Sequence, residues 1–408
     1  MIVLAGGDLV LPDRIVTAGS LVLDEGRITA IDSRDRVEPD GAMVVAVRDC
    51  YVVPGFVDVH VHGALGVDVL DGPDSVARVA ACLPRFGVTA FCPTSIACGP
   101  AGLDAMLTEL RDARLAGNGD SARVLPAHLE SNFINPEYRG AQPLECIRTP
   151  GPFAAELRPA AEVGTPVGTD AFTARQILDV IAAHRADVGI VTLAPEMPGG
   201  LDLVKDLVAM GIRVSLGHTG ATFEEANDAI DAGVRHATHL FNRMAPLQHR
   251  APGATGAALA REEVCAELIC DGFHVHPAVC RVAMATKGAG GIMAITDGTA
   301  GSGQPAGSTA RLGGQRITVR EQAAFLDDGT LAGSVLTMDR AFRMIATQFG
   351  GSTVEAAQLC ATTPARQLGL FGFGVIADGA VADLTVLDRG FRVARTFIEG
   401  RQVWPREP

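Results

Sequence analysis

The first fifty residues of the chain alternate between apolar and polar positions, a pattern typical of strands that bury one face. In the stretch 15–33 this alternation continues on both sides of a Glu25-Gly26 turn, which predicts a small antiparallel sheet. After residue 54 the pattern changes to short continuous apolar runs separated by segments with helical spacing, as in strand-helix units around a parallel sheet. The change predicts a domain boundary near residue 54.

Eight such apolar runs follow the boundary. They cover residues 56–62, 88–94, 124–130, 189–196, 213–218, 236–242, 266–272 and 291–297. The segments between them have helical spacing, and one begins with a Thr222-x-x-Glu225 capping box. Eight strand-helix units predict an α/β fold, a closed (β/α)8 TIM barrel over residues 55–371.

Two intervals between the runs, 131–173 and 298–336, are longer than a simple crossover requires. The second contains the sequences RITV and AAFL beside polar turns, which predict an inserted hairpin. Long loops that follow strands frequently contain functional residues. After residue 371 the alternating pattern returns, so we expect residues 372–408 to complete a small β-sandwich domain with residues 1–54.

Composition and charge restrict the class of protein. The 408 residues are 48% hydrophobic and 20% charged, which indicates a folded globular chain and not a disordered one. The formal charge of −13 disfavours nucleic acid and anionic membranes as partners. No run of 18 apolar residues and no signal-peptide pattern occurs, which predicts a cytoplasmic protein. Serine hydrolases and ATPases are disfavoured because their glycine-rich motifs are absent.

Residue types that bind metals stand at the ends of five of the eight predicted strands. They are His60 and His62 in strand one, Glu130 in strand three, His218 in strand five, His239 in strand six and Asp297 in strand eight. In a barrel of this kind the carboxyl ends of the strands form the active face. The fold would therefore bring these residues together although they are far apart in the sequence.

The residue types indicate a catalytic metal centre. Two imidazoles and one carboxylate, from His218, His239 and Glu130, leave coordination positions open for water and substrate. The pair His60 and His62 points to one side of its strand and is either a further ligand pair or a structural one. A metal lowers the pKa of bound water, and Asp297 could then accept a proton and pass it to a leaving nitrogen. The alternative for Asp297 is a cap of the strand-end turn.

The other histidines have simpler interpretations. We expect His128 and His236 to be structural and His184 to lie on the surface. The pair His249-Arg250 and the residue His274 fall in the loops after strands six and seven. At both positions a substrate contact and a loop hydrogen bond are equally compatible with the sequence.

Longer motifs resemble a known family over nearly the whole chain. They include VVPGFVDVHVHG, AHLE, VTLAPEM, SLGHTGAT, ATHLFNRM, HRAPG, ICDGFHV, ITDG and LAGSVLTM. The chain resembles the amidohydrolase superfamily and, within it, the N-acetylglucosamine-6-phosphate deacetylase family. The resemblance implies a metal-dependent hydrolase that releases acetate from an N-acetylamino sugar phosphate.

The resemblance also implies roles for the residues at the strand ends. Glu130, His218 and His239 would bind the main divalent metal, and Asp297 would be the general base and then the acid. In relatives with His-x-His, residues matching His60 and His62 hold a second ion with Glu130 as a bridge, so one or two ions are expected. Zinc is the first candidate, with iron, manganese and cobalt as alternatives.

For the substrate, the resemblance implies that Asn242 and the backbone at Arg243 contact the phosphate and that His274 contacts the sugar ring. Arg250 would reach the phosphate across a subunit interface, which predicts a homodimer. The guanidinium fork of arginine suits a phosphate because it donates two parallel hydrogen bonds.

The chain departs from the family pattern in two places. The loop after strand three has Glu130-Ser131-Asn132 for the usual Glu-Gly-Pro, and further on Gln142 replaces a histidine that helps to polarise the acetyl carbonyl in relatives. Gln142 must either donate through its amide or leave this task to the metal. Arg243 stands where relatives often have alanine and could add a charge near the phosphate.

Two alternatives remain at this point. One is a different amide hydrolase on the same barrel, similar to dihydroorotase or hydantoinase, although these usually have a bridging lysine on strand four and GIVTLAPE has none. The other is a noncatalytic oligomeric scaffold. The joint presence of the six strand-end residues argues against the scaffold.

Overall fold

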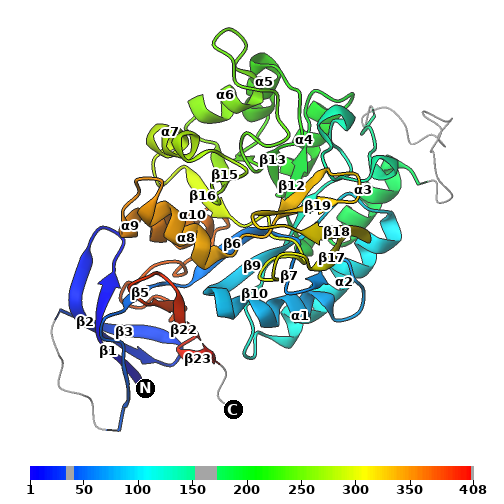
Figure 1. Ribbon diagram of the computed structural model, residues 1–408. Coiled ribbons are helices and arrows are strands. Elements are labelled where there is room, and N and C mark those ends of the chain that lie inside the picture. The colour runs from blue at the N-terminus through cyan, green and yellow to red at the C-terminus, as the bar shows by residue number, and fades with distance from the viewer. Residues whose placement is uncertain (34–40, 152–171, 406–408) are drawn as a thin grey trace.

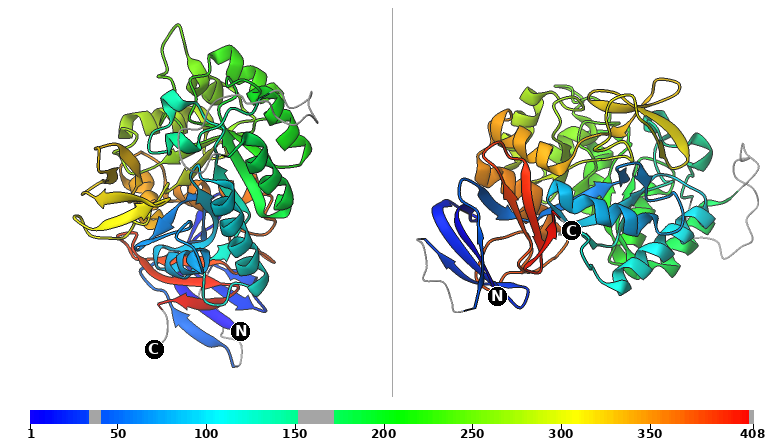
Figure 2. Two further views of the ribbon diagram at one scale, coloured as in Figure 1. Left: turned by 90° about the vertical axis from the view of Figure 1, so that its right-hand side faces the viewer. Right: turned by 60° about the horizontal axis from the view of Figure 1, so that its bottom comes forward.

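The computed structural model describes residues 1–33, 41–151 and 172–405, and it consists of a barrel and a separate sheet built from both ends of the chain (Figure 1). This sheet, called the terminal sheet below, has the strand order β23-β22-β21-β5-β1-β2-β3, with β4 paired to β1. Its strands are β1 (Ile2–Val10), β2 (Ile15–Asp24), β3 (Arg27–Asp32), β4 (Met43–Ala46), β5 (Tyr51–Pro54), β21 (Leu384–Leu387), β22 (Val393–Ile398) and β23 (Arg401–Trp404). In both views of Figure 2 the first and last segments of the chain lie side by side.

The alternation in the first fifty residues follows from the burial of one face of the terminal sheet. The predicted hairpin is confirmed, because β2 and β3 pair antiparallel with Asp24 opposite Arg27. Glu25 and Gly26 both have positive φ angles, 46° and 77°, as hairpin turns that match the twist of the strands require. The apolar side chains pack into a cluster whose largest members include Leu4, Leu9, Leu21, Leu23, Ile28 and Phe397.

The barrel has eight parallel strands, as the eight apolar runs predict. They are β6 (Phe56–Val61), β9 (Val88–Ser95), β11 (Ala127–Glu130), β12 (Val188–Leu193), β13 (Arg213–Leu216), β14 (His236–Ala237), β15 (Cys265–Ile269) and β16 (Ile292–Ile295). The first and last strands are joined near their carboxyl ends, where the N–H of Asp297 donates to the carbonyl of His60 at 3.0 Å. The predicted (β/α)8 fold is confirmed.

Strand β14 is much shorter than the predicted run 236–242. The chain leaves the strand after Ala237, because His239, Phe241 and Arg243 have φ angles of 29°, 77° and 51° that no strand allows. The apolar and polar pattern does not reveal such a series of turns. The functional residues of this segment therefore lie on a loop and not on a strand.

Helices cover the outside of the barrel (Figures 1 and 2). The α-helices are α1 (Ser75–Cys82), α2 (Pro100–Ala116), α3 (Ala174–Ala183), α4 (Gly200–Ala209), α5 (Phe223–Asp231), α6 (Gly253–Ala260), α7 (Pro277–Lys287), α8 (Met338–Thr347), α9 (Thr353–Ala357) and α10 (Thr363–Gln367). The predicted capping box starts α5, which buries Ala226, Ala229 and Ile230. Short 3-10 turns are η1 (Leu83–Phe86), η2 (Pro136–Tyr138), η3 (Leu144–Cys146) and η4 (Arg185–Asp187), and the π-helix η5 (Gln358–Thr362) joins α9 to α10.

The interval 298–336 forms more than the predicted hairpin. Its strands β17 (Thr309–Leu312), β18 (Gln315–Val319), β19 (Ala323–Leu326) and β20 (Leu331–Ser334) make a four-stranded antiparallel sheet, called the inserted sheet below. The sequences RITV and AAFL are its two central strands, and its apolar face packs on Ile96. A small hairpin, β7 (Gly63–Ala64) and β8 (Val67–Asp68), and the strand β10 (Arg123–Val124) complete the set of strands.

The chain passes from the terminal sheet to the barrel with Gly55 alone between β5 and β6. The division into a unit of residues 1–54 with 372–408 and a unit of residues 55–371 stays a prediction. Part of the predicted long loop, residues 152–171, and the last residues, 406–408, lie outside the described residues. Among the described helices, none has the length and hydrophobicity that crossing a bilayer requires.

Candidate active site

A pocket at the carboxyl ends of the barrel strands contains most of the predicted site residues. It is open to solvent, and its outline spans about 470 Å³ with that open space included. Its lining includes His62, Glu130, Gln142, His218, His239, Asn242, Arg243, His274 and Asp297. The inserted sheet contributes Leu312, Leu331 and Gly333, and the loop after β11 contributes Gly140 and Ala141. The two long intervals of the sequence thus form walls of this pocket.

Glu130, His218 and His239 converge on one point of the pocket. Glu130 Oε1 lies 2.8 Å from the Nε2 atom of each histidine, and the two Nε2 atoms are 3.0 Å apart. His218 Nδ1 donates to the carbonyl of Tyr138 at 2.8 Å, so Nε2 is the nitrogen that faces the pocket. One carboxylate oxygen and two imidazole nitrogens therefore meet from three different strand ends.

A second group joins the first from the opposite side. His60 and His62 lie with their Nε2 atoms 3.2 Å apart and at 3.4 and 3.2 Å from Asp297 Oδ1. His62 Nε2 is also 3.6 Å from Glu130 Oε2, while its Nδ1 donates to the carbonyl of Thr94 at 3.0 Å. Glu130 thus lies between the two groups, with one oxygen near each.

Backbone conformation directs these side chains into the pocket. His218, His239 and Asp297 have φ angles of 49°, 29° and 48°, in the left-handed region that residues other than glycine rarely adopt. Such strained positions concentrate at functional sites, where the surrounding structure enforces them. Each strand therefore ends in a sharp turn at the residue that carries the chemistry.

Electrostatics makes the pocket favourable for a cation. Burial alone would lower the pKa of His62 and of His239, but hydrogen bonds and charge from Asp297 and Glu130 outweigh burial and raise both pKa values to about 9. A buried site that holds protons this strongly has a negative potential. The donor set of two imidazoles and one carboxylate also matches that of catalytic zinc sites, so these residues fit a divalent metal ion.

Asp297 is held at the seam of the barrel, next to the ligand candidates. Its carbonyl accepts from the N–H of Ser334, and a side chain at Gly333 would lie 3.1 Å from that carbonyl. Burial raises the pKa of Asp297, but the hydrogen bond and the charge of the imidazoles of His62 and His60 lower it by a larger amount. The net pKa is therefore below the usual 3.8. Asp297 is therefore an ionised carboxylate, ready to accept a proton.

Gln142 occupies the pocket wall in a fixed orientation. Its amide oxygen accepts from the N–H of Ala97 at 2.7 Å, and its amide nitrogen donates to Glu130 Oε2. Because the side chain has two amide N–H groups, at most one is left for a substrate carbonyl. The hydrogen bond to Glu130 is a role that the sequence does not suggest.

The predicted sugar and phosphate residues line the mouth of the pocket. His274 Nδ1 donates to Asp271 Oδ2 at 2.6 Å, and within the described residues its buried Nε2 has no hydrogen-bond partner. A substrate hydroxyl would satisfy this nitrogen. The amide nitrogen of Asn242 lies 3.1 Å from the carbonyl of His239, which fixes the turn, and Arg243 lies exposed beside Gly140.

His249 and Arg250 are not brought to the pocket. Both are exposed on the loop between β14 and α6, and neither belongs to the pocket lining of its own subunit. Arg250 would therefore reach a substrate only in the pocket of a neighbouring subunit, as predicted. That contact stays a prediction.

Several residues differ from expectation. His128 and His236 are buried in the barrel, as expected of structural residues, but His184 is not on the surface: it is 6% exposed and bonds Asp104 Oδ1 at 2.9 Å. Glu267 was missed altogether. It is a fully buried carboxylate in the middle of β15 that contacts His60, and a charged residue within an apolar run is the signal that could have identified it.

Comparison with known proteins agrees with the fold. The amidohydrolase family model matches residues 51–403. The N-acetylglucosamine-6-phosphate deacetylase of Bacillus subtilis (strain 168) is 32% identical over 96% of this chain and 94% of its own length. The N-acetylgalactosamine-6-phosphate deacetylase of Escherichia coli O157:H7 is 33% identical over 88% of this chain and 89% of its own.

Solved structures give the same result. A variant of N-acetyl-D-glucosamine-6-phosphate deacetylase from Mycobacterium smegmatis, in complex with N-acetyl-D-glucosamine-6-phosphate, has a TM-score of 0.86 and 30% identity over 98% of this chain and 99% of its own. The enzyme from Thermotoga maritima has a TM-score of 0.83 and 31% identity over 99% of both chains. From its strand-end residues, its fold and these relatives, the chain belongs to the amidohydrolase family and, within it, to the N-acetylglucosamine-6-phosphate deacetylases.

Proposed function

We propose that this protein is a metal-dependent deacetylase that hydrolyses the acetamide of N-acetylglucosamine 6-phosphate, or of a close epimer, to the amino sugar phosphate and acetate. The observation that carries the proposal is the meeting of Glu130, His218 and His239 beside the ionised Asp297 in one pocket. Relatives that act on the glucosamine and on the galactosamine compound both match the chain, so the epimer is a matter for direct measurement.

The residues proposed to hold the metal are Glu130, His218 and His239, with His60, His62 and Asp297 as the set for a second ion. Zinc is the first choice for this donor set, with iron, manganese and cobalt as alternatives. A bound divalent ion would lower the pKa of the attacking water and stabilise the negative charge that develops on the carbonyl oxygen.

Asp297 carries the proton through the reaction. Its carboxylate accepts a proton as water adds to the acetamide carbon, and it returns this proton to the nitrogen as the C–N bond breaks. One water is consumed, and acetate and the free amine leave. The low pKa of Asp297 keeps it ionised before the reaction, which suits a base that starts without a proton.

Binding of the sugar phosphate is assigned to the mouth of the pocket. We propose that His274 Nε2 bonds a sugar hydroxyl and that Asn242, Arg243 and the neighbouring subunit's loop at His249-Arg250 bind the phosphate. Gln142 would orient Glu130 through one amide N–H, and its second amide N–H would donate a hydrogen bond to the acetyl carbonyl of the substrate. We further propose that the enzyme is cytoplasmic and a homodimer. The homodimer is supported by Arg250, which is exposed and lies outside the pocket of its own subunit.

The alternative hydrolases of the same barrel receive no support from a specific observation. Dihydroorotase-like enzymes bridge their metals with a modified lysine on the fourth barrel strand, whereas β12 contains no lysine. Glu130 on β11 lies between both ligand groups instead. An acyclic acetamide therefore remains the favoured substrate.

The direct test is acetate release from N-acetylglucosamine 6-phosphate by purified protein. We expect turnover as isolated, loss of turnover after chelation, and recovery when zinc is added back. Separate assays with manganese, iron and cobalt would rank the ions. Protein that contains metal but releases no acetate from either epimer would refute the proposed substrate, and turnover that survives complete metal removal would refute the mechanism.

A further inference from the structure

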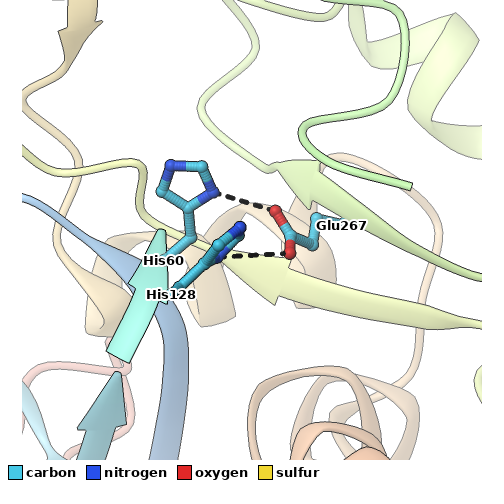
Figure 3. A group of neighbouring side chains, drawn as sticks. All are labelled: His60, His128 and Glu267. Atoms are coloured by element: carbon cyan, nitrogen blue, oxygen red, sulfur yellow. Dashed lines mark hydrogen bonds and ion pairs between the residues drawn. The ribbon is translucent and has the colours of Figure 1, made fainter. Parts of the chain in front are cut away.

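Glu267 is a buried carboxylate that the proposed mechanism does not use. It lies in the middle of β15, surrounded by apolar residues, and its side chain is fully buried. An isolated carboxylate at such a position would strongly destabilise the fold, so its partners must compensate for the lost hydration. Figure 3 shows that these partners are His60 and His128, which point toward it from β6 and β11.

The strongest contact of Glu267 is with a metal-ligand candidate. Its Oε2 lies 2.9 Å from His60 Nδ1, and the backbone N–H of His239 donates to the same oxygen at 3.4 Å. Its other oxygen, Oε1, lies 3.7 Å from His128 Nδ1. Glu267 therefore touches one residue from each of the two ligand groups, beneath the floor of the pocket.

The three residues could be taken for a further metal site, since their ligand atoms lie within 4.8 Å of one another. Both nitrogens of His128 are already bonded, however: Nδ1 donates to the carbonyl of Val59 at 3.0 Å and Nε2 bonds Thr192 Oγ1 at 2.7 Å. The group is therefore a buried support within the barrel, in which Glu267 bonds His60 and lies beside His128, and not a site for an ion.

The position of the proton on His60 decides what its other nitrogen can do. Nε2 faces His62 Nε2 at 3.2 Å and Asp297 Oδ1 at 3.4 Å, inside the second ligand group. If Nδ1 carries the hydrogen and donates it to Glu267, Nε2 has a free lone pair for a metal. If Nε2 carries the hydrogen, it cannot be a ligand.

We propose that Glu267 is a positioning residue, which holds His60 in the Nδ1–H tautomer and so enables His60, His62 and Asp297 to bind a second divalent ion. The inference rests on the proposed metal-dependent function. It means that a residue on β15 affects metal binding, although this strand contributes no ligand candidate.

The first test measures zinc binding to apoprotein, by competition with a chelator of known affinity and by elemental analysis. The variants are E267Q, which keeps the shape and one acceptor oxygen, and E267L, which removes both acceptors. The control is S215A, which removes a hydroxyl of comparable burial whose bond to Thr238 Oγ1 involves no ligand candidate. Turnover of each protein, loaded with zinc, is measured in parallel.

We expect wild type and S215A to bind two zinc ions with unchanged affinities. The weaker site should lose about 10-fold in affinity in E267Q and about 100-fold in E267L, the range typical of lost carboxylate partners of metal-bound histidines. The tighter site, at His218 and His239, should change less. Wild-type protein that binds one ion, or E267 variants with wild-type affinity at both sites, would overturn the proposal.

The second test observes the tautomer without metal. Long-range nitrogen–proton NMR spectra of histidine-labelled apoprotein at pH 8.5 should show His60 with its hydrogen on Nδ1, the signal being identified by its loss in H60Q. In E267L the hydrogen should move to Nε2. The Nε2–H form in wild type would overturn the inference, whereas metal-dependent acetate release in the same preparation would leave the proposed function intact.

Discussion

The barrel interior and the terminal sheet differ in the kind of side chain that they bury. The core of the terminal sheet consists mainly of leucine, valine and isoleucine side chains with Phe397, and the carboxylate of Asp383 is buried directly before β21. The centre of the barrel holds fully buried His60, His128 and Glu267 together with the ligand candidates above them. Buried polar groups contribute little net stability, whereas buried apolar area is the main stabilising term. We therefore expect substitutions in the barrel interior to change chemistry and those in the terminal sheet to change stability.

The sharpest test on the barrel side is D297N. The amide keeps the shape of the side chain but cannot accept the proton, so kcat should fall by about 10³-fold, within the range for lost acid-base groups. The ion held by Glu130, His218 and His239 should remain bound and the thermal midpoint should stay near wild type, as elemental analysis and calorimetry would show. A variant that keeps more than a tenth of the wild-type turnover would remove Asp297 from its assigned role.

On the other side of the comparison, L21A should lower the free energy of unfolding by about 2–5 kcal/mol, because it leaves a cavity in the core of the terminal sheet. Its kcat and KM should equal those of wild type below the unfolding transition. Urea unfolding and steady-state assays at one temperature measure both. A fall in kcat comparable with the fall in stability would show that the two regions are not separable.

The next largest effect is expected at Arg250, which is predicted to contact the substrate phosphate of the neighbouring subunit. R250A should raise KM for the phosphorylated sugar by about 10- to 100-fold, the effect of losing a charged hydrogen bond, and leave kcat/KM for the nonphosphorylated sugar unchanged. R148A would be a suitable control, because Arg148 packs on Phe172 and lies outside the pocket lining. Equal losses on both substrates would contradict a phosphate role for Arg250.

The smallest expected effect is a pH-dependent change in stability that comes from Asp383, the buried residue directly before β21. Burial raises the pKa of Asp383 to about 6, above the usual 3.8. Between these values the folded state binds more protons than the unfolded state, so the contribution of Asp383 to stability decreases as the pH rises from about 4 to above 6.

The variant D383N removes this titration. Relative to wild type, its free energy of unfolding should rise by about 1 to 2 kcal/mol between pH 4.5 and pH 7.5. Urea unfolding of both proteins at the two pH values measures the difference. The same difference at both pH values would show that Asp383 has no raised pKa in the folded state.

The hydrophobic pattern was sufficient to predict the eight barrel strands and the strand ends that carry His60, Glu130, His218 and Asp297. This success has a physical reason: parallel strands buried on both faces form continuous apolar runs, so a polar residue at the end of a run stands out. The turns after Ala237 were not predictable, because positive φ angles at His239 and Phe241 are imposed by tertiary contacts.

The contacts that Glu267 and Gln142 make could not be predicted from the sequence, for a different reason. Each acts through a partner more than ten residues away, His60 for one and Glu130 for the other, and only the closed barrel shows that these side chains meet. His184 follows the last residue of α3 and is buried because its ring bonds Asp104 of α2, a pairing that the sequence does not reveal. Side-chain pairing across elements is the information that a single sequence lacks.

The seam of the barrel has a consequence for how the enzyme is made. The hydrogen bond from the N–H of Asp297 to the carbonyl of His60 joins the first and last strands of the barrel. A chain that stops before β16 therefore has the ligand candidates of the earlier strands but no Asp297 beside them. During synthesis, we expect the proposed base to join the ligand candidates only after β16 has been made and has closed the ring.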